Sequence, residues 1–205
     1  MTRRKRQLPL LFPPAWGGKR KGSGPKRKRA IKGVSHRRRP ILPTRLPVHV
    51  TLRVRAHVYN LRSRRCFQPI QDAFLCAHDR FGFRLTHFSV QGNHIHLIGE
   101  AEHWRALARG IQGLTIRIAK GLNRVMQRRG RVFADRYHAH VLRTPTEVRH
   151  ALQYVLNNHA KHSAQYGEPV QAGYCDPYSS AVFHSVDPPI LSEPRTWLLS
   201  QRGWR

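Results

Sequence analysis

The chain has 205 residues, of which 38 are Lys or Arg and only 10 are Asp or Glu, giving a formal net charge of +28. A basic excess of this size repels itself unless a polyanion neutralises it, and nucleic acid is the commonest such partner. No apolar run approaches the roughly 18 residues that cross a bilayer, so we expect no membrane span. Cys66, Cys76 and Cys175 have no metal-type spacing, and we expect reduced thiols in a cytoplasmic protein.

Residues 1–44 are predicted to form a basic arm. Clusters of Lys and Arg alternate there with Pro and Gly, and almost no apolar residue recurs periodically. Such a segment buries too little surface to offset its ordering entropy. We interpret it as a flexible arm that follows phosphates without reading base sequence, and a purely solubilising tail is the alternative.

The next residues predict a strand, a helix and a hairpin. Apolar and polar residues alternate over 48–54, which indicates a half-buried strand. Apolar residues recur at three- and four-residue steps over 67–81, which predicts an amphipathic helix ending near Gly82. Residues 83–90 and 94–99 are predicted to be two strands joined by a tight turn.

Two further helices and one strand follow. An apolar stripe over 104–127 predicts a long helix, and 132–142 predicts a fourth strand. The run Thr144-Pro145-Thr146-Glu147 offers an N-cap threonine, a proline at the first helical position and a glutamate at the third. This capping box predicts the start of the last helix.

The resulting β-α-β-β-α-β order, followed by a helix, predicts an α+β fold. Two crossovers around a hairpin give the ferredoxin-like arrangement, an antiparallel four-stranded sheet with two helices on one face. The strand that begins at His94 is expected to be central in this sheet. We expect this domain over residues 45–165, and a C-terminal extension over 166–205 that could wrap the domain, meet DNA or form a partner contact.

The central strand carries two histidines in alternation. Since successive side chains of a strand point to opposite faces, His94 and His96 are predicted to emerge side by side while Ile95 and Leu97 enter the core. Two neutral imidazoles on one face can hold a divalent ion, and a tyrosine beside it could attack a phosphodiester. With 14 histidines in the chain, about one His-x-His is expected by chance, so satisfied core histidines are the alternative.

The last helix is predicted to have two distinct faces. At 100° per residue, its apolar face contains Val148, Leu152, Val155 and His159. Another face, about a third of a turn away, contains Glu147, Tyr154, Asn158 and Lys161. A tyrosine at the centre of the apolar stripe would most simply be core, so the position of Tyr154 favours a functional role.

A second His-x-His, His138 and His140, is interpreted as lying outside the metal site. Ala139 between them is small, and this strand is expected near a sheet edge. Lining a DNA groove is the alternative for this pair. Tyr137 is a rival nucleophile, although a strand tyrosine at this place more often packs or stacks on a base.

Basic and aromatic residues provide candidate DNA contacts. Five lie largely outside the apolar stripe of the long helix: Arg105, Arg109, Arg117, Lys120 and Arg124. A solvated basic face is the simpler interpretation of any one of them. Arg136 and Tyr137, beside Phe133, suit phosphate neutralisation with base stacking, and Lys161 lies on the tyrosine face.

Several stretches together carry a resemblance to a known family. They are Asn93-His94-Ile95-His96-Leu97-Ile98, the helix containing Asn123, the Gly130…Phe133…Arg136-Tyr137 segment, Tyr154-Val155-Leu156-Asn157-Asn158, and Asp176-Pro177-Tyr178-Ser179-Ser180. On these residues the chain resembles the HUH-type single-strand transposases, and most closely the REP-associated tyrosine transposases. The resemblance runs from about residue 46 to 185 and omits the basic arm.

This resemblance implies a bacterial, nucleoid-associated enzyme with a ferredoxin-like catalytic domain. By position, His94 and His96 would bind Mg²⁺ or Mn²⁺, Asn158 would be the third ligand, and Tyr154 would be the nucleophile. The implied substrate is single-stranded or hairpin DNA, cleaved and rejoined through a 5′-phosphotyrosine. Relatives often work as dimers, so a homodimer stays open. The Asn-Pro often found after the tyrosine is Asn158-His159 here.

Two other classes of function are weighed against the enzyme. A catalytically silent nucleic-acid-binding protein of ferredoxin-like fold would also explain the charge. An RNA-recognition motif, however, carries aromatic residues where this chain has His94 and His96. A ribosome-associated structural protein leaves the Tyr154 face without a purpose. Metal-dependent cleavage separates the enzyme from both.

Overall fold

The structure, a computed structural model, describes residues 42–43, 46–76, 82–165, 173–183 and 190–200. The predicted basic arm lies outside the described residues, apart from 42–43, as do parts of the predicted C-terminal extension. The elements, in chain order, are β1 (Val48–Arg53), α1 (Arg64–Leu75), β2 (Phe83–Val90), β3 (His94–Ala101), α2 (Trp104–Val125), β4 (His138–Val141), α3 (Pro145–Gln165), the 3-10 helix η1 (Ser180–Val182) and α4 (Trp197–Ser200). None of the helices in these ranges is long and apolar enough to cross a bilayer.

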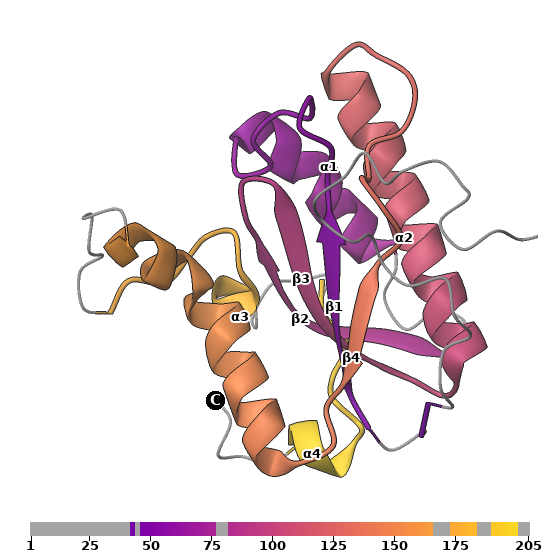
Figure 1. Cartoon of the computed structure of the whole chain (residues 1–205), viewed down its shortest axis with the longest axis vertical. Coiled ribbons are helices and arrows are strands. Elements are labelled where there is room, and N and C mark those ends of the chain that lie inside the picture. Colours follow the sequence, from indigo (N-terminus) through magenta and orange to yellow (C-terminus); the bar gives the residue numbers. More distant parts are fainter. Residues whose placement is uncertain (1–41, 44–45, 77–81, 166–172, 184–189, 201–205) are drawn as a thin grey trace, which may run out of the picture. The chain divides into compact units, whose positions relative to one another are not determined.

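The four strands form one sheet in the order β2-β3-β1-β4 (Figure 1). Every neighbouring pair is antiparallel. The predicted α+β class with a four-stranded antiparallel sheet is therefore confirmed. β3 and β1 are the two central strands, so the strand that carries His94 and His96 is flanked on both sides.

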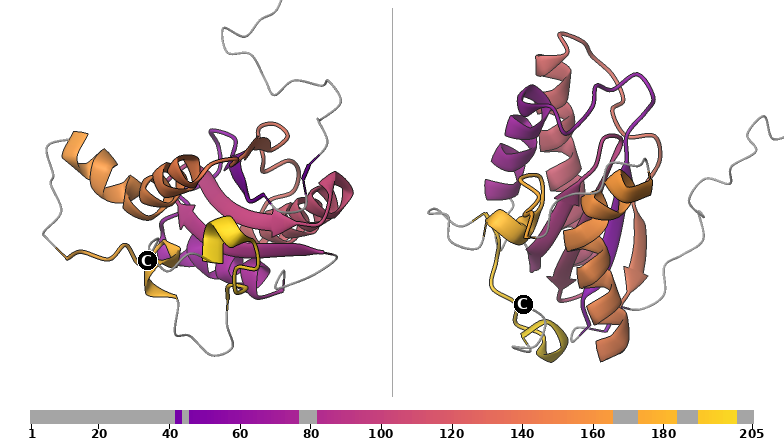
Figure 2. Two further views of the ribbon diagram at one scale, coloured as in Figure 1. Left: turned by 90° about the horizontal axis from the view of Figure 1, so that it is seen from below. Right: turned by 90° about the vertical axis from the view of Figure 1, so that its left-hand side faces the viewer.

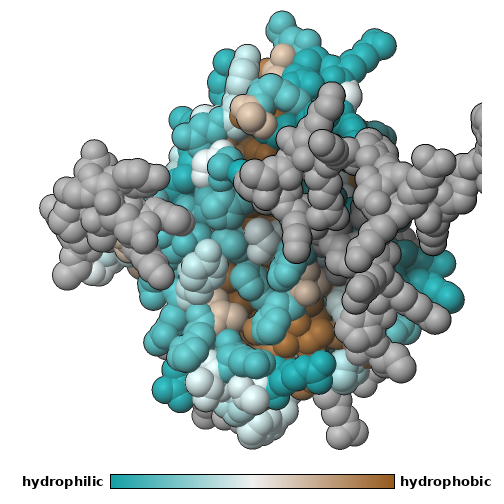
Figure 3. Space-filling model, viewed as in Figure 1, coloured by the Kyte–Doolittle hydropathy of each residue, from teal (hydrophilic) through white to brown (hydrophobic). Residues whose placement is uncertain are grey.

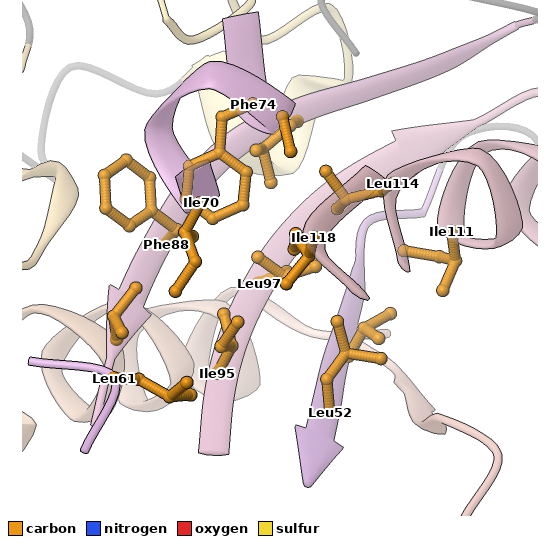
Figure 4. Close-up of a cluster of buried hydrophobic side chains, with 14 of the residues drawn as sticks. Leu52, Leu61, Ile70, Phe74, Phe88, Ile95, Leu97, Ile111, Leu114 and Ile118 are labelled. Carbon is orange, nitrogen blue, oxygen red and sulfur yellow. The ribbon is translucent and has the colours of Figure 1, made fainter. Parts of the chain in front are cut away.

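Helices cover both faces of the sheet, and the two faces differ in composition. α1 and α2 pack on one face, whereas α3 lies on the other (Figure 2). On the α1–α2 face, Leu52, Ile95 and Leu97 from the strands meet apolar side chains of both helices, including Phe74 and Ile118 (Figure 4). On the opposite face, Ile98 joins a smaller apolar cluster with residues of α3 and α4.

Two glycines allow α2 to approach its neighbours closely. A Cβ atom at Gly110 would lie 2.4 Å from the ring of Phe83 on β2. A Cβ atom at Gly121 would lie 2.5 Å from the side chain of Pro69 on α1. Real Cβ atoms do not approach other atoms this closely, so both positions require glycine for the packing of α2.

The start of α3 agrees with the sequence. The backbone N–H of Glu147 donates to Oγ1 of Thr144 over 3.1 Å, and Pro145 is the first helical residue. The carboxylate of Glu147 accepts from the backbone N–H of Arg143, one residue before the N-cap. These contacts satisfy donors that a helix start leaves open, and they fix where the helix carrying Tyr154 begins.

Two predicted elements have different bounds in the structure. α1 begins at Arg64 rather than 67 and ends at Leu75, well before Gly82. β4 is four residues long, because residues 132–137 form a loop that touches the sheet through a single bridge between Val54 and Phe133.

The described parts of the C-terminal segment pack along β2 and β3. Backbone bonds join Val90 N–H to the Tyr178 carbonyl and Ser192 N–H to the Leu85 carbonyl, each over 2.8 Å. The buried carboxylate of Glu100 accepts from the backbone N–H groups of Arg195 and Thr196, which precede α4. The C-terminal segment therefore covers the outer edge of the sheet beside β2.

A buried ion pair also holds the C-terminal segment. The guanidinium of Arg62 donates to both carboxylate oxygens of Asp176, over 2.8 and 2.9 Å. The same guanidinium lies 4.4 Å from the centre of the Tyr178 ring. A bidentate pair of this kind fixes both distance and orientation.

Candidate active site

The alternation of β3 puts His94 and His96 on the sheet face that α3 covers. Their ring centroids are 4.7 Å apart and the rings meet edge to face. Ile95 and Leu97 between and after them belong to the opposite, apolar face. The two imidazoles are therefore neighbours, as the sequence pattern predicts.

Tyr154 of α3 lies beside His96 of this pair. Its ring centroid is 5.0 Å from that of His96, with the planes 79° apart. The side chain remains 40% exposed. The phenol ring in this position packs against the imidazole of His96 while staying accessible to a large substrate.

A third histidine, His49 on β1, contacts His96, and the sequence alone did not predict this contact. Nε2 of His49 lies 3.1 Å from Nδ1 of His96, and the ring of His49 is 6.1 Å from that of Tyr154. Oγ1 of Thr51 lies 3.3 Å from the same Nδ1 atom. Nδ1 of His96 therefore has hydrogen-bonding partners on the neighbouring strand, which restrain the orientation of this ring.

The ionisation of His49 is strongly shifted. Burial, together with the nearby His140 and His138, lowers its pKa from 6.5 to about 4. In the antiparallel register His140 lies opposite His49, and His138 lies opposite Thr51. His49 is therefore a neutral imidazole near pH 7, with one N–H and one lone pair.

The second His-x-His lies on the same sheet face as the first, on the edge strand β4. Both His138 and His140 are exposed, whereas Ala139 packs against the apolar face. The edge position agrees with the sequence. Their proximity to His49 was not foreseen, because it depends on the pairing of β4 with β1.

Asn158 lies one turn after Tyr154, but it is almost fully buried at 1% exposure. Neither Oδ1 nor Nδ2 of its amide has a hydrogen-bond partner within the described ranges. Leaving such a group unsatisfied costs about 1–3 kcal/mol, so the amide is a candidate ligand position. No group of three or more His, Cys, Asp or Glu residues that could hold a metal occurs among the described residues.

The predicted faces of α3 need one correction. The buried stripe contains Val148, Ala151, Leu152, Val155 and Asn158. His159, predicted within the stripe, is only half-buried, and its ring is 5.9 Å from that of Tyr174. A step of four residues turns a helix by about 40°, so Asn158 lies between the apolar stripe and Tyr154.

The predicted DNA contacts do not gather around Tyr154. The five basic residues of α2 (Arg105, Arg109, Arg117, Lys120 and Arg124) belong to a helix on the opposite side of the sheet. Four of them are exposed, while the half-buried Arg117 donates to the carbonyl of Gly113. In the loop before β4, Arg136 is exposed and Tyr137 packs partly against the apolar core. The side chain of Lys161 lies outside the described residues.

Comparison with known proteins supports the fold assignment. A solved structure of a REP-associated tyrosine transposase bound to a REP hairpin superimposes with a TM-score of 0.54. It shares 18% sequence identity, and the match covers 80% of this chain and 93% of that chain. The α+β fold of this chain is therefore similar to the fold of that protein.

The remaining comparisons give a weaker structural match or no match. A bacterial tRNA(His) guanylyltransferase (Thg1)-like protein in complex with GTP has a TM-score of 0.47 and 14% identity, covering 65% of this chain and 71% of that chain. No protein-family model matches the sequence, and no curated protein matches it.

Proposed function

We propose that this protein cleaves and rejoins single-stranded or hairpin DNA, with Tyr154 as the nucleophile and a divalent cation bound by His94, His96 and Asn158. The observation that carries the proposal is the exposed phenol of Tyr154, whose ring lies 5.0 Å from the His96 ring on the polar face of the sheet. The likeness in fold to a REP-associated tyrosine transposase supports it. The strand order β2-β3-β1-β4 with α1 and α2 on one face supports a ferredoxin-like domain.

The residues fit a small divalent cation. Two imidazoles lie side by side, and a buried amide on α3 has no hydrogen-bond partner in the described part of the chain. Two imidazole nitrogens and one amide oxygen, without thiolate, suit Mn²⁺ better than Mg²⁺, which prefers oxygen ligands, and they leave positions open for phosphate oxygens. When bound, the cation would polarise the scissile phosphate.

His49 and Thr51 would act as positioning residues for this site. Both approach Nδ1 of His96, so His96 would present Nε2 to the cation. Groups that hydrogen-bond a metal-binding histidine fix its tautomer and ring orientation. Because His49 is neutral near pH 7, its ring can hold this contact without placing a charge beside the cation.

The chemical step belongs to Tyr154. Its phenolic oxygen would form a bond to phosphorus while the bond from phosphorus to the 3′ oxygen breaks. The phenol gives up its proton, the departing 3′ oxygen takes up a proton, and the 5′ phosphate remains on the tyrosine. Attack by a 3′ hydroxyl on this phosphotyrosine reverses the step and rejoins the strand.

The test is covalent capture. Purified protein would be incubated with labelled single-stranded hairpins from the host genome, with Mn²⁺, Mg²⁺ or EDTA, beside Tyr154→Phe and the matched control Tyr137→Phe. We expect a metal-dependent covalent adduct in the wild type and in Tyr137→Phe, and none in Tyr154→Phe. Adduct that survives in Tyr154→Phe would assign the nucleophile elsewhere. Tight binding without adduct would favour a catalytically silent DNA-binding protein.

A further inference from the structure

Two loops rich in arginine meet at one end of the sheet. Residues 53–65, from the last residue of β1 to the first turn of α1, contain five arginines and no Asp or Glu. Residues 127–134, which follow α2, contain three arginines and no acidic residue. Six of these arginines are exposed, and we call them the arginine rim: Arg53, Arg55, Arg64, Arg65, Arg129 and Arg131.

Backbone contacts hold the two loops together. The N–H of Arg55 donates to the carbonyl of Val132, and the N–H of Ala134 donates to the carbonyl of Arg53, each over 2.9 Å. Figure 1 shows the end of β1 and the end of α2 at the same edge of the fold. Hydrophilic residues dominate that end of the molecule in Figure 3. The backbone at Arg53 and Arg55 therefore lies beside the backbone of residues 132–134, although the two segments are distant in the chain.

The rim is not neutralised by the described part of the protein. No ion pair to its six arginines occurs among the described residues, which contain only two salt bridges. Arg62, in the same loop, shows the contrast, since Asp176 pairs with it. Asp135, the first acidic residue after the second loop, accepts from the backbone N–H of Arg136. Six like charges without acidic partners favour a polyanion.

An exposed aromatic residue lies between Arg55 and Arg62 in the sequence of the first segment. Tyr59, in the β1–α1 loop, is 55% exposed. Exposed aromatic rings among basic groups suit stacked bases with neutralised phosphates, and acidic proteins or lipid headgroups offer no planar base to stack. This combination favours nucleic acid over either of those partners.

The rim also adjoins the candidate active site. Arg53 pairs with His94 in the β1–β3 register, and the N–H of Val54 donates to the carbonyl of Asn93 over 3.0 Å. We propose that the arginine rim and Tyr59 bind the sugar-phosphate backbone and bases of a DNA strand that continues from the Tyr154 site. This inference rests on the proposed function for its substrate, and it replaces the basic face of α2 as the DNA-binding surface.

The test compares two pairs of arginines with the same change in charge. Arg55→Ala/Arg131→Ala removes two rim charges, and Arg105→Ala/Arg109→Ala removes two from α2. The full chain would be titrated, by fluorescence anisotropy, against an oligothymidylate of roughly 20 nucleotides, longer than common single-strand site sizes. Salt would be varied over roughly 50 to 200 mM. Thermal unfolding would confirm that each variant is folded.

We expect the rim pair to weaken binding about tenfold at roughly 100 mM salt and to reduce the salt slope by about 1.4, since each phosphate contact contributes about 0.7 for a single strand. The α2 pair should change binding by less than about twofold. Tyr59→Leu should weaken binding at least about fivefold without changing the slope, because stacking involves no counterion release. Equal losses in both pairs, or a larger loss in the α2 pair, would overturn the assignment.

The two experiments can contradict the proposed nuclease function and the proposed role of the arginine rim independently. Rim-dependent binding by a wild-type protein that forms no covalent adduct would support the rim and contradict the nuclease. Adduct formation with binding that ignores the rim substitutions would support the nuclease and contradict the rim.

Discussion

The two faces of β1 and β3 use alternate residues of the same strands for different purposes. One face presents Leu52, Ile95 and Leu97 to α1 and α2, and these side chains are almost fully buried. The other presents His49 and His96 to α3, whose half-exposed Tyr154 packs against their rings. Neighbouring residues of one strand therefore lie on opposite faces, one in the apolar core and the next at the candidate active site. A substitution on one face should therefore change a different measured quantity from a substitution on the other.

Leu97→Ala should have the largest effect on stability. Leu97 is 1% exposed within the main core, and truncating such a side chain typically costs 2–5 kcal/mol, so we expect about 3 kcal/mol. Urea unfolding followed by circular dichroism measures this change. A loss below about 1 kcal/mol would mean that the α1–α2 face does not carry the main core.

His49 makes the polar face sensitive to acid. Its pKa is about 4 in the folded protein and about 6.5 when unfolded, so between these values the unfolded chain binds more protons and stability falls as pH falls. This difference in pKa lowers the free energy of unfolding by at most about 3 kcal/mol, and the full loss is reached below the pKa of the folded protein. Unfolding in EDTA at a series of pH values, for the wild type and His49→Gln, isolates this contribution. Identical pH profiles for the two proteins would contradict the shifted pKa.

Asn158→Leu should raise stability slightly in the absence of metal, whereas Leu97→Ala should lower it. Replacing the unpartnered amide with an apolar side chain of similar size should stabilise the protein in EDTA by about 1 kcal/mol. Mn²⁺ should raise the melting temperature of the wild type but not that of the variant. A Mn²⁺-induced rise retained in Asn158→Leu would remove Asn158 from the cation site. Val155→Ala, in the neighbouring apolar cluster, is the control and should lose stability with or without Mn²⁺.

The sequence predicts local features of this molecule well. β2 and the starts of β3, α2 and α3 fall where alternation, periodicity and the capping box place them. The first turn of α1 was missed because Arg64 and Arg65 are polar and add nothing to an apolar stripe. β4 was predicted too long because residues 132–137 resemble a strand in composition, yet contact β1 through one bridge only.

The features that the sequence does not predict depend on pairing between distant segments. His49 reaches His96 only through the β1–β3 register, and nothing near residue 49 in the chain indicates this contact. Four of the five basic residues of α2 are exposed, but periodicity cannot tell which face of the sheet a helix covers. The sequence also does not indicate that the two segments of the arginine rim lie side by side, because they are more than sixty residues apart.

The C-terminal segment along β2 has a consequence for the behaviour of the protein at high concentration. An open strand edge exposes rows of backbone donors and acceptors that can recruit another chain. Here the described C-terminal residues occupy part of the β2 edge, through the contacts of Tyr178 and Ser192. The opposite edge is formed by β4, which is only four residues long and offers little backbone for pairing. A shortened chain ending before residue 173 would retain all the candidate catalytic residues while opening a long edge to aggregation.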